Sequence, residues 1–262
     1  MNWFLVGRYF LYHLKARHYR GYGIHSPFVF DLVRNLLHVK PSWKHPEIIK
    51  TVRQHYRKSQ QVISVMDLGA GSTQLKSTSR KVKHIAKYSA IAPHYGVLLS
   101  KLVCRFMPEV ILEFGTSLGI STLYLASGKP NAKIITMEGC GECATLARDT
   151  FNRLGFSSIE VKEGAFDEVL PTILTRNPKI DFAFIDGNHT KEATLLYVQK
   201  CIEAGHNDSV IVLDDIHWSR GMEEAWNELC QHPKVTVSID VFQLGILFLR
   251  KECQKQHFVV RY

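Results

Sequence analysis

Acidic residues are scarce in the first part of this chain. Residues 1–105 contain 3 Asp and Glu against 18 Lys and Arg, whereas residues 106–262 contain 21 acidic against 15 basic residues. The formal net charge of +9 therefore comes from the first part. Such an asymmetry indicates two functional regions, the basic one facing an anionic substrate, nucleic acid or a membrane surface. The alternative is a solvated basic surface without a dedicated partner.

Long apolar runs and paired cysteines are also lacking. The apolar stretch 3–14 is interrupted by Arg8 and is too short to span a bilayer, and it lacks the features of a signal peptide. We expect it to be an amphipathic helix that caps the core or a partner subunit, with a membrane surface as the alternative. The six cysteines are scattered, which excludes a secreted disulfide framework. For the lone Cys140-x-x-Cys143 we favour packing at a helix start over metal or redox use, and we expect a cytoplasmic protein.

Residues 1–82 carry no catalytic signature. Helices are predicted from Ser26-Pro27 and from Pro46, because proline favours the first turn. Residues 59–82 begin like a strand with a glycine turn, yet 74–81 has no apolar periodicity, so we expect a polar, basic loop there. Helical spacing returns over 82–107. We predict a basic, mainly helical region at 1–82 and a second domain at 83–262.

The second domain is organised around a glycine-bearing turn between a strand and a helix. Val110-Ile111-Leu112 is a short buried strand, and apolar residues at helical spacing follow residue 122. Between them, Glu113 to Thr122 lacks the Lys-Ser/Thr of a P-loop and the G-x-G-x-x-G of dinucleotide sites. An acidic residue ends the strand instead. Glu113 beside a glycine turn suits a ligand that carries an ammonium group.

Strands and helices then alternate regularly. Strands are expected at 133–138, 158–162, 180–185 and 209–213, and the tight link between 235–241 and 245–250 implies an antiparallel hairpin at one sheet edge. This pattern predicts an α/β, Rossmann-like doubly wound sheet, mostly parallel, with an N-terminal helical region. Ligands bind at the carboxyl ends of such strands. Five acids fall there: Glu113, Glu138, Asp186, Asp214 and Asp215.

These motifs carry a resemblance. Residues 89–250 resemble class I S-adenosylmethionine-dependent methyltransferases, most of all the catechol O-methyltransferase-like and cephalosporin-hydroxylase-like groups, and the whole chain is similar to a bacterial family of such enzymes. The resemblance rests on Glu113–Ser121, Thr136–Glu138, Gly164–Asp167, Phe184–His189 and Leu213–Asp215. It implies these cofactor-binding residues: Glu113, Gly115, Thr116, Ser117, Gly119, Ser121, Glu138, which would bind the ribose, Gly164, Ala165, Phe166 and Asp186.

The resemblance also implies a Mg²⁺ site and a catalytic base. Asp186, Asp214 and Asp215 stand where metal-dependent relatives have three oxygen ligands, although Asp214 or Asp215 could instead cap the following helix. The catechol-type enzymes have a lysine base three residues past the first ligand, and this chain departs from them with His189. A free histidine titrates near ~6.5, which suits proton removal near neutrality. We predict His189 as base together with Asp186, and His217 as the second candidate.

The predicted function is S-adenosylmethionine-dependent O-methylation of a small-molecule or glycan- or lipid-linked hydroxyl, with Mg²⁺ as a second cofactor. The alternatives are an RNA or protein methyltransferase that docks its substrate on the basic region, and a non-catalytic protein that binds S-adenosylmethionine. The fourth-strand motif at Asp186 is unlike the Asn-Pro-Pro-Tyr motif of many RNA N-methyltransferases, which lowers the RNA alternative. Expected partners are a small-molecule acceptor, with nucleic acid, peripheral membrane contact through the N-terminal helix, and a homodimer as further hypotheses.

Overall fold

The computed structural model describes residues 3–16, 18, 21–37, 46–65 and 79–262. By compactness the chain divides into two units, one formed by residues 41–178 and the other by residues 1–40 together with 179–262. The predicted domain boundary after residue 82 stays a prediction.

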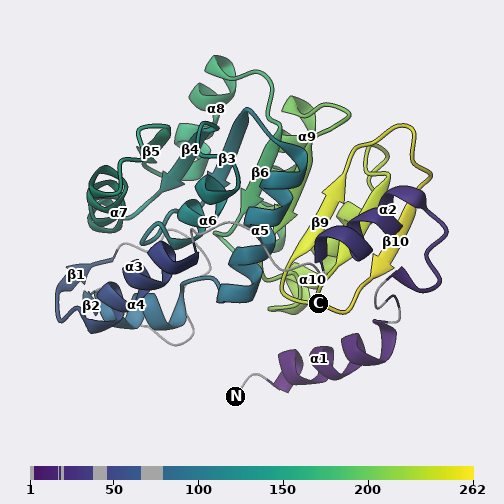
Figure 1. Cartoon of the computed structure of the whole chain (residues 1–262), viewed down its shortest axis with the longest axis horizontal. Helices are drawn as coiled ribbons and strands as arrows, with labels where there is room; N and C mark the ends of the chain where they lie inside the picture. The colour runs from purple at the N-terminus through teal and green to yellow at the C-terminus, as the bar shows by residue number, and fades with distance from the viewer. Residues whose placement is uncertain (1–2, 17, 19–20, 38–45, 66–78) are drawn as a thin grey trace. The chain divides into compact units, whose positions relative to one another are not determined.

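The 41–178 unit contains three parallel strands in the order β3-β4-β5. The apolar runs of β3 and β4 are typical of strands covered on both faces, and the β3 residues Ile111 and Leu112 are completely buried. Figure 1 shows α3 beside α4 and α5 beside α6 in this unit. The strands are β3 (Val110–Phe114), β4 (Lys133–Glu138) and β5 (Ile159–Glu163), and the helices are α3 (Pro46–Lys58), α4 (Val82–Tyr88), α5 (Pro93–Phe106), α6 (Ile120–Gly128), α7 (Gly141–Arg153) and α8 (Phe166–Arg176).

Two sequence predictions for this unit need correction. Ser79–Lys81, predicted as part of a polar loop, forms strand β2, which pairs antiparallel with β1 (Val62–Ser64). The ladder supplies backbone hydrogen bonds that apolar periodicity does not report. Within the predicted loop at 59–82, residues 66–78 lie outside the described residues. Phe166 and Asp167, predicted in a turn, are the first residues of helix α8.

The second unit has five strands in the order β10-β8-β9-β7-β6. Strands β6 and β7 are parallel, and β8 and β9 form the predicted antiparallel hairpin. The hairpin is not at the edge as predicted, because β10 pairs with β8 on its outer side. The elements are α1 (Trp3–Lys15), α2 (Pro27–Asp31), the π-helical η2 (Leu32–Leu37), β6 (Phe182–Ile185), α9 (Lys191–Ala204), β7 (Val210–Leu213), α10 (Arg220–Gln231), β8 (Val237–Asp240), β9 (Gly245–Phe248) and β10 (Gln256–Val259).

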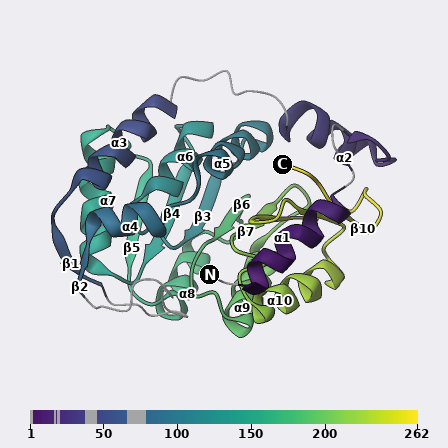
Figure 2. The ribbon, with the colours of Figure 1, turned by 90° about the horizontal axis from the view of Figure 1, so that it is seen from below.

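Helix α1 is fastened to the carboxyl-terminal part of the chain. The Tyr12 hydroxyl donates a 2.6 Å hydrogen bond to the carbonyl oxygen of Val260, and Arg8 forms an ion pair with Glu223 of α10. Figure 2 shows α1 running beside α10. The predicted amphipathic helix is therefore confirmed as an element that packs on its own unit.

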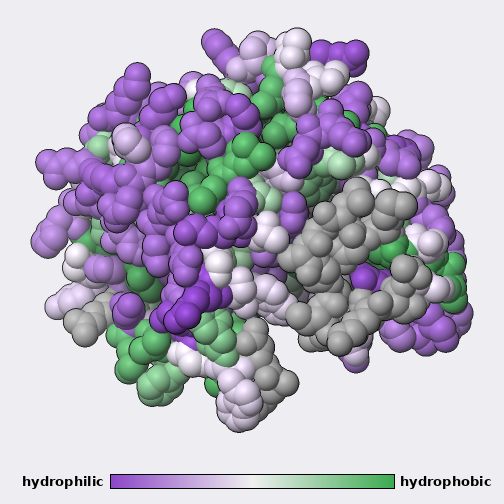
Figure 3. Space-filling view, turned by 180° about the vertical axis from the view of Figure 1, so that it is seen from behind, coloured by the Kyte–Doolittle hydropathy of each residue, from purple (hydrophilic) through white to green (hydrophobic). Residues whose placement is uncertain are grey.

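The other face of α1 stays uncovered in the structure. Trp3, Phe10 and Leu14 are all more than half exposed, and Figure 3 shows the apolar surface of this helix at its lower left. Among the described residues, no helix combines the length and the apolar character needed to cross a membrane. Membrane contact and dimer formation through α1 stay predictions.

Taken together, the elements confirm the predicted α/β class, with a mostly parallel sheet, an antiparallel hairpin and amino-terminal helices.

Candidate active site

The turn after β3 is held in a backbone conformation that requires glycine at two of its positions. Gly115 and Gly119 have φ angles of 94° and 76°, and Ser117 between them also lies at a positive φ, 47°. A Cβ atom on Gly119 would lie 2.5 Å from Cζ of Phe151. Gly119 is therefore required for its backbone angle and for the close approach of α7 to the start of α6.

Glu138 at the end of β4 binds this turn. Its carboxylate accepts a 2.6 Å hydrogen bond from the Ser117 backbone N–H and a 2.8 Å hydrogen bond from the N–H of Cys140. One side chain therefore links the turns that follow β3 and β4. The Thr116 and Thr136 hydroxyls, 2.6 Å apart, form a second link between the same two segments.

Glu113 is completely buried beneath the turn. One of its carboxylate oxygens accepts a 2.5 Å hydrogen bond from the Thr122 hydroxyl, and the other, Oε1, is buried and has no hydrogen-bond partner among the described residues. Burial raises the pKa of this carboxyl to about 7, and hydrogen bonds from Thr122 and Ser121 oppose the rise. The buried, unpartnered oxygen fits a cationic group such as the ammonium of S-adenosylmethionine.

The predicted adenine-side residues follow β5, the next strand. Gly164 has a φ of 137°, and its N–H donates a 3.0 Å hydrogen bond to the carbonyl oxygen of Glu138. Ala165 precedes α8, and the Phe166 ring meets the Phe114 ring edge-on, with 5.6 Å between centroids. The predicted cofactor residues of this unit thus lie at the carboxyl ends of three neighbouring strands.

The second unit holds the predicted metal ligands. Ile185 pairs with Leu213 in the parallel ladder of β6 and β7, so Asp186 and Asp214 follow these strands at the same edge. Asp214 is buried, and its pKa lies well above the usual range because of burial, with further rises from the negative charges of Asp186 and Asp215. The Asp186 and Asp215 carboxylates are thus each close enough to Asp214 to repel its negative charge.

The chemistry of this donor set fits a hard divalent cation, because carboxylate oxygens are its preferred ligands and the ion would offset their repulsion. Within the part of the chain that the structure describes, no group of three or more His, Cys, Asp or Glu side chains is already arranged around one metal position. The Mg²⁺ site remains a prediction.

The two candidate bases are placed differently. His189 Nε2 lies 3.6 Å from Asp186 Oδ1, beside the carboxylate cluster as predicted. His217 Nε2 lies 2.8 Å from Asp240 Oδ2, and its ring stacks on Phe242, so it is held by β8 and the link that follows. This arrangement favours His189 as the group next to the candidate metal ligands.

Ser219, and neither aspartate, occupies the N-cap of α10. Its hydroxyl accepts a hydrogen bond of 3.2 Å from the N–H of Met222. The alternative in which Asp214 or Asp215 caps this helix is therefore wrong, and both carboxylates are available for other roles.

Two contributors to the site are absent from the sequence predictions. Gln243, in the link between β8 and β9, hydrogen-bonds Asp214 through its side chain, and Thr122 supports Glu113. Thr122 is the last residue of the glycine-turn motif and the third residue of α6. Its position in that motif could therefore have identified it as a site residue. Gln243 lies in a hairpin with no motif of its own, and no sequence signal marks it.

Comparison with known proteins shows which proteins this chain is similar to. Residues 112–216 match the family model described as a methyltransferase domain. Over 129 residues the chain is 33% identical to a catechol O-methyltransferase of Mycobacterium tuberculosis, which covers 48% of this chain and 57% of that protein. The chain thus spans little more than half the length of this curated relative.

Solved structures show the same fold. The O-methyltransferase from Bacillus cereus in complex with SAH superposes with a TM-score of 0.55 at 20% identity, over 84% of this chain and 97% of that one. TomG from Streptomyces achromogenes, an O-methyltransferase in complex with SAM, gives a TM-score of 0.57 at 17% identity, over 85% and 96% of the two chains.

The superpositions and the matched stretch define the class of fold, which is a methyltransferase fold. More narrowly, residues 112–216 match a methyltransferase domain, and about half of the chain is similar in sequence to catechol O-methyltransferases. The predicted family resemblance is confirmed.

Proposed function

We propose that this protein transfers the methyl group of S-adenosylmethionine to a hydroxyl group of a small molecule, with Mg²⁺ as a second cofactor. The observation that carries the proposal is the pair of carboxylates at the ends of β3 and β4. Glu138 is bound to the turn that Gly115 and Gly119 shape, and Glu113 keeps a buried, unpartnered oxygen beneath the same turn.

The turns that follow β3, β4 and β5 would hold the cofactor. The amino-acid end would lie on the turn 115–121, where the α6 N-terminus offers backbone N–H groups and Glu113 a negative charge. Glu138 would exchange its bonds to the backbone N–H groups of Ser117 and Cys140 for bonds to the ribose hydroxyls. Gly164, Ala165 and Phe166 would border the adenine. S-adenosylmethionine, when bound, supplies an electrophilic methyl group on a sulfonium sulfur.

The acceptor hydroxyl would be handled by the residues after β6 and β7. Asp186, Asp214 and Asp215 would hold Mg²⁺, which lowers the pKa of a hydroxyl that it binds. His189 would accept the hydroxyl proton at Nε2 as the oxygen attacks the methyl carbon. The new carbon–oxygen bond forms as the carbon–sulfur bond breaks, and the sulfur leaves as a neutral thioether. Most of the rate enhancement would come from holding the reactants in line.

The test is methyl transfer from radiolabelled S-adenosylmethionine to catechol, chosen because relatives are named for that acceptor. We expect label in an extractable methyl ether when Mg²⁺ is present, and a loss of at least about 100-fold in kcat for His189→Ala, in line with general base catalysis. A matched control is His206→Ala, because His206 is a half-exposed histidine of the same unit that pairs with Asp181 away from the cluster.

If a panel of catechols and simple phenols accepts no label while S-adenosylhomocysteine binds, the small-molecule acceptor is wrong and the cofactor assignment stands. If neither transfer nor cofactor binding occurs, the whole proposal is wrong.

A further inference from the structure

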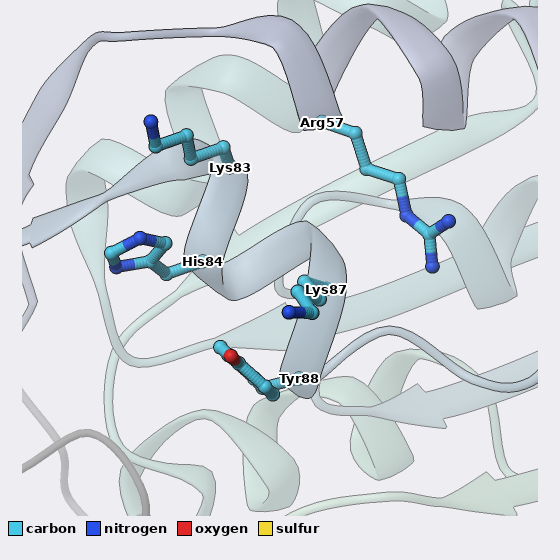
Figure 4. A pocket seen from close by; sticks show the side chains of 5 residues that line it. All are labelled: Arg57, Lys83, His84, Lys87 and Tyr88. Atoms are coloured by element: carbon cyan, nitrogen blue, oxygen red, sulfur yellow. The ribbon is translucent and has the colours of Figure 1, made fainter.

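The 41–178 unit contains a cavity that none of the proposed methyl-transfer residues lines. It is an open depression of about 350 Å³ and is lined by Arg57, Lys83, His84, Lys87 and Tyr88. Figure 4 shows Arg57 reaching from α3, while the other four side chains project from α4. Its volume is at the lower end of the range of roughly 300–1,000 Å³ found for small-molecule sites.

The framework of α4 fixes these side chains in position. Val82, Ile85 and Ala86 are buried, which leaves residues 83, 84, 87 and 88 together on the opposite face of the helix. Lys83 donates a 3.0 Å hydrogen bond from Nζ to Oε1 of Gln60, so this ammonium group is held on the rim. The lining therefore comes from two helices that pack on each other, and one of its cations is tied to Gln60.

The two chain segments that supply the lining are strongly basic. Across 46–64 and 79–107 the sequence has one acidic residue, Glu47, which lies 3.6 Å from Lys50. The neighbouring cation Arg53 is buried and donates a hydrogen bond to the carbonyl oxygen of Ile91. Burial lowers the pKa of Arg53, and the charge of Arg57 adds to that lowering. The repulsion among these cations would be relieved by a bound anion.

The lining residues favour a phosphoryl group over a single carboxylate. The Arg57 guanidinium offers a planar fork that matches phosphate oxygens, and Lys83 and Lys87 add two point charges. His84 and the Tyr88 hydroxyl supply further donors. Three permanent cations around one cavity suit a ligand with at least two negative charges, and a small cavity suits a phosphorylated small molecule better than an extended polymer.

We propose that the cavity lined by Arg57, Lys83, His84, Lys87 and Tyr88 binds the phosphoryl group of a soluble phosphorylated small molecule. This site goes beyond the proposed methyl transfer and does not depend on it. In this proposal, part of the basic charge of the amino-terminal part binds one specific ligand and does not serve as a general electrostatic attractant.

The experiment is calorimetric titration of the full chain with inorganic pyrophosphate at low ionic strength. We compare the wild type with Arg57→Gln/Lys87→Gln, which removes two lining charges, and with Lys50→Gln/Lys58→Gln, which removes two exposed charges of α3 outside the lining. We expect saturable binding that weakens at least about tenfold in the first variant and less than about threefold in the second, since hydrogen bonds between charged groups are stronger than those between neutral groups.

Equal weakening in both double variants would overturn the proposal, because it would show attraction to net charge alone. Absence of pyrophosphate binding would overturn it as well, whether or not an RNA oligonucleotide or vesicles of phosphatidylcholine and phosphatidic acid bind. Binding of RNA alone would assign the basic surface to a nucleic acid, and binding of vesicles alone would assign it to a membrane. All four substituted positions are exposed, and melting curves of each variant show whether the fold is intact.

Discussion

The Ser117 backbone N–H donates a 2.6 Å hydrogen bond to the Glu138 carboxylate, which joins the turn after β3 to the end of β4. Ser117 lies at a positive φ, a conformation that costs free energy in a residue other than glycine. The charged hydrogen bond helps to stabilise that conformation. The geometry of the loop therefore depends on this chain's own residues, and substitutions can test it.

Gly119→Ala should lower the free energy of unfolding by more than backbone strain alone would. The new methyl group would lie 2.5 Å from Phe151 Cζ, in addition to the cost of an alanine at φ 76°. We expect a loss of about 2–5 kcal/mol in the free energy of unfolding, from about 1–2 kcal/mol of backbone strain and about 1–3 kcal/mol of overpacking. Chemical denaturation measures it.

Gly155→Ala is the matched control, because Gly155 has the same φ of 76° and no atom within 4 Å of the added Cβ. It should lose only the backbone contribution. Equal losses in the two variants would show that the close approach of Phe151 has no energetic weight.

Glu113 should make stability depend on pH in a defined direction. Its pKa in the folded protein, about 7, is above its ordinary value of 4.5. The unfolded chain therefore releases this proton first, and the stability contributed by the protonated form is complete below about pH 4.5 and is lost as the pH rises through 7. The size of this contribution is at most about 3 kcal/mol, because each tenfold difference in proton affinity between the two states corresponds to about 1.4 kcal/mol.

Glu113→Gln should remove that part of the slope, so that its stability relative to the wild type rises between pH 5 and 8. Glu109→Gln, at an exposed position just before the same strand, serves as the control. The free energy of unfolding at a series of pH values gives the answer. Parallel curves for wild type and Glu113→Gln would contradict the buried, protonated carboxyl.

Asp186→Asn should separate cofactor binding from turnover. Loss of one carboxylate from the proposed metal site should lower kcat at least about 100-fold, a loss of about 2.7 kcal/mol in the transition state, while the affinity for S-adenosylhomocysteine changes less than about threefold. Asp208→Asn, on the surface of the same unit, is the control. Full turnover in the presence of a chelator would show that the reaction needs no divalent cation.

Tyr12→Phe should loosen helix α1. The hydroxyl donates to the Val260 carbonyl oxygen at 2.6 Å and accepts from the N–H of Tyr262 at 3.2 Å, so its removal leaves a buried acceptor unpaired. We expect a loss of about 1–3 kcal/mol and faster amide exchange in α1. Tyr9→Phe is the control, because Tyr9 is half-exposed and contacts Phe242 through its ring. Unchanged exchange in Tyr12→Phe would show that α1 is held by other contacts.

Local pattern was sufficient for most of the fold. The apolar bursts before Glu113, Glu138, Asp186 and Asp214 marked parallel strands, because strands covered on both faces have few polar residues. Prediction from local pattern failed where a strand exists only because it pairs with a strand distant in the sequence. Strand β10, Gln256–Val259, is short and half polar, and its partner β8 lies nearly twenty residues earlier in the chain.

The site shows the same division. Spacing identified Glu138 as the acid after β4, yet it could not show that its carboxylate binds the N–H groups of Ser117 and Cys140, because those bonds depend on how two turns meet. Spacing likewise ranked His217 as a second base. The partner Asp240 lies 23 residues away, and only the structure brings these two side chains together.

The central claim is that the carboxylate of Glu138 and the glycine turn form a binding site for S-adenosylmethionine. Calorimetry of S-adenosylhomocysteine binding to the wild type and to Glu138→Ala tests it most directly, with Glu160→Ala, exposed on β5, as control. The account predicts saturable binding to the wild type and the control, weakened at least about 100-fold in Glu138→Ala, from the loss of two hydrogen bonds to a charged group. Absence of heat with the wild type, or equal affinity in all three proteins, would contradict it.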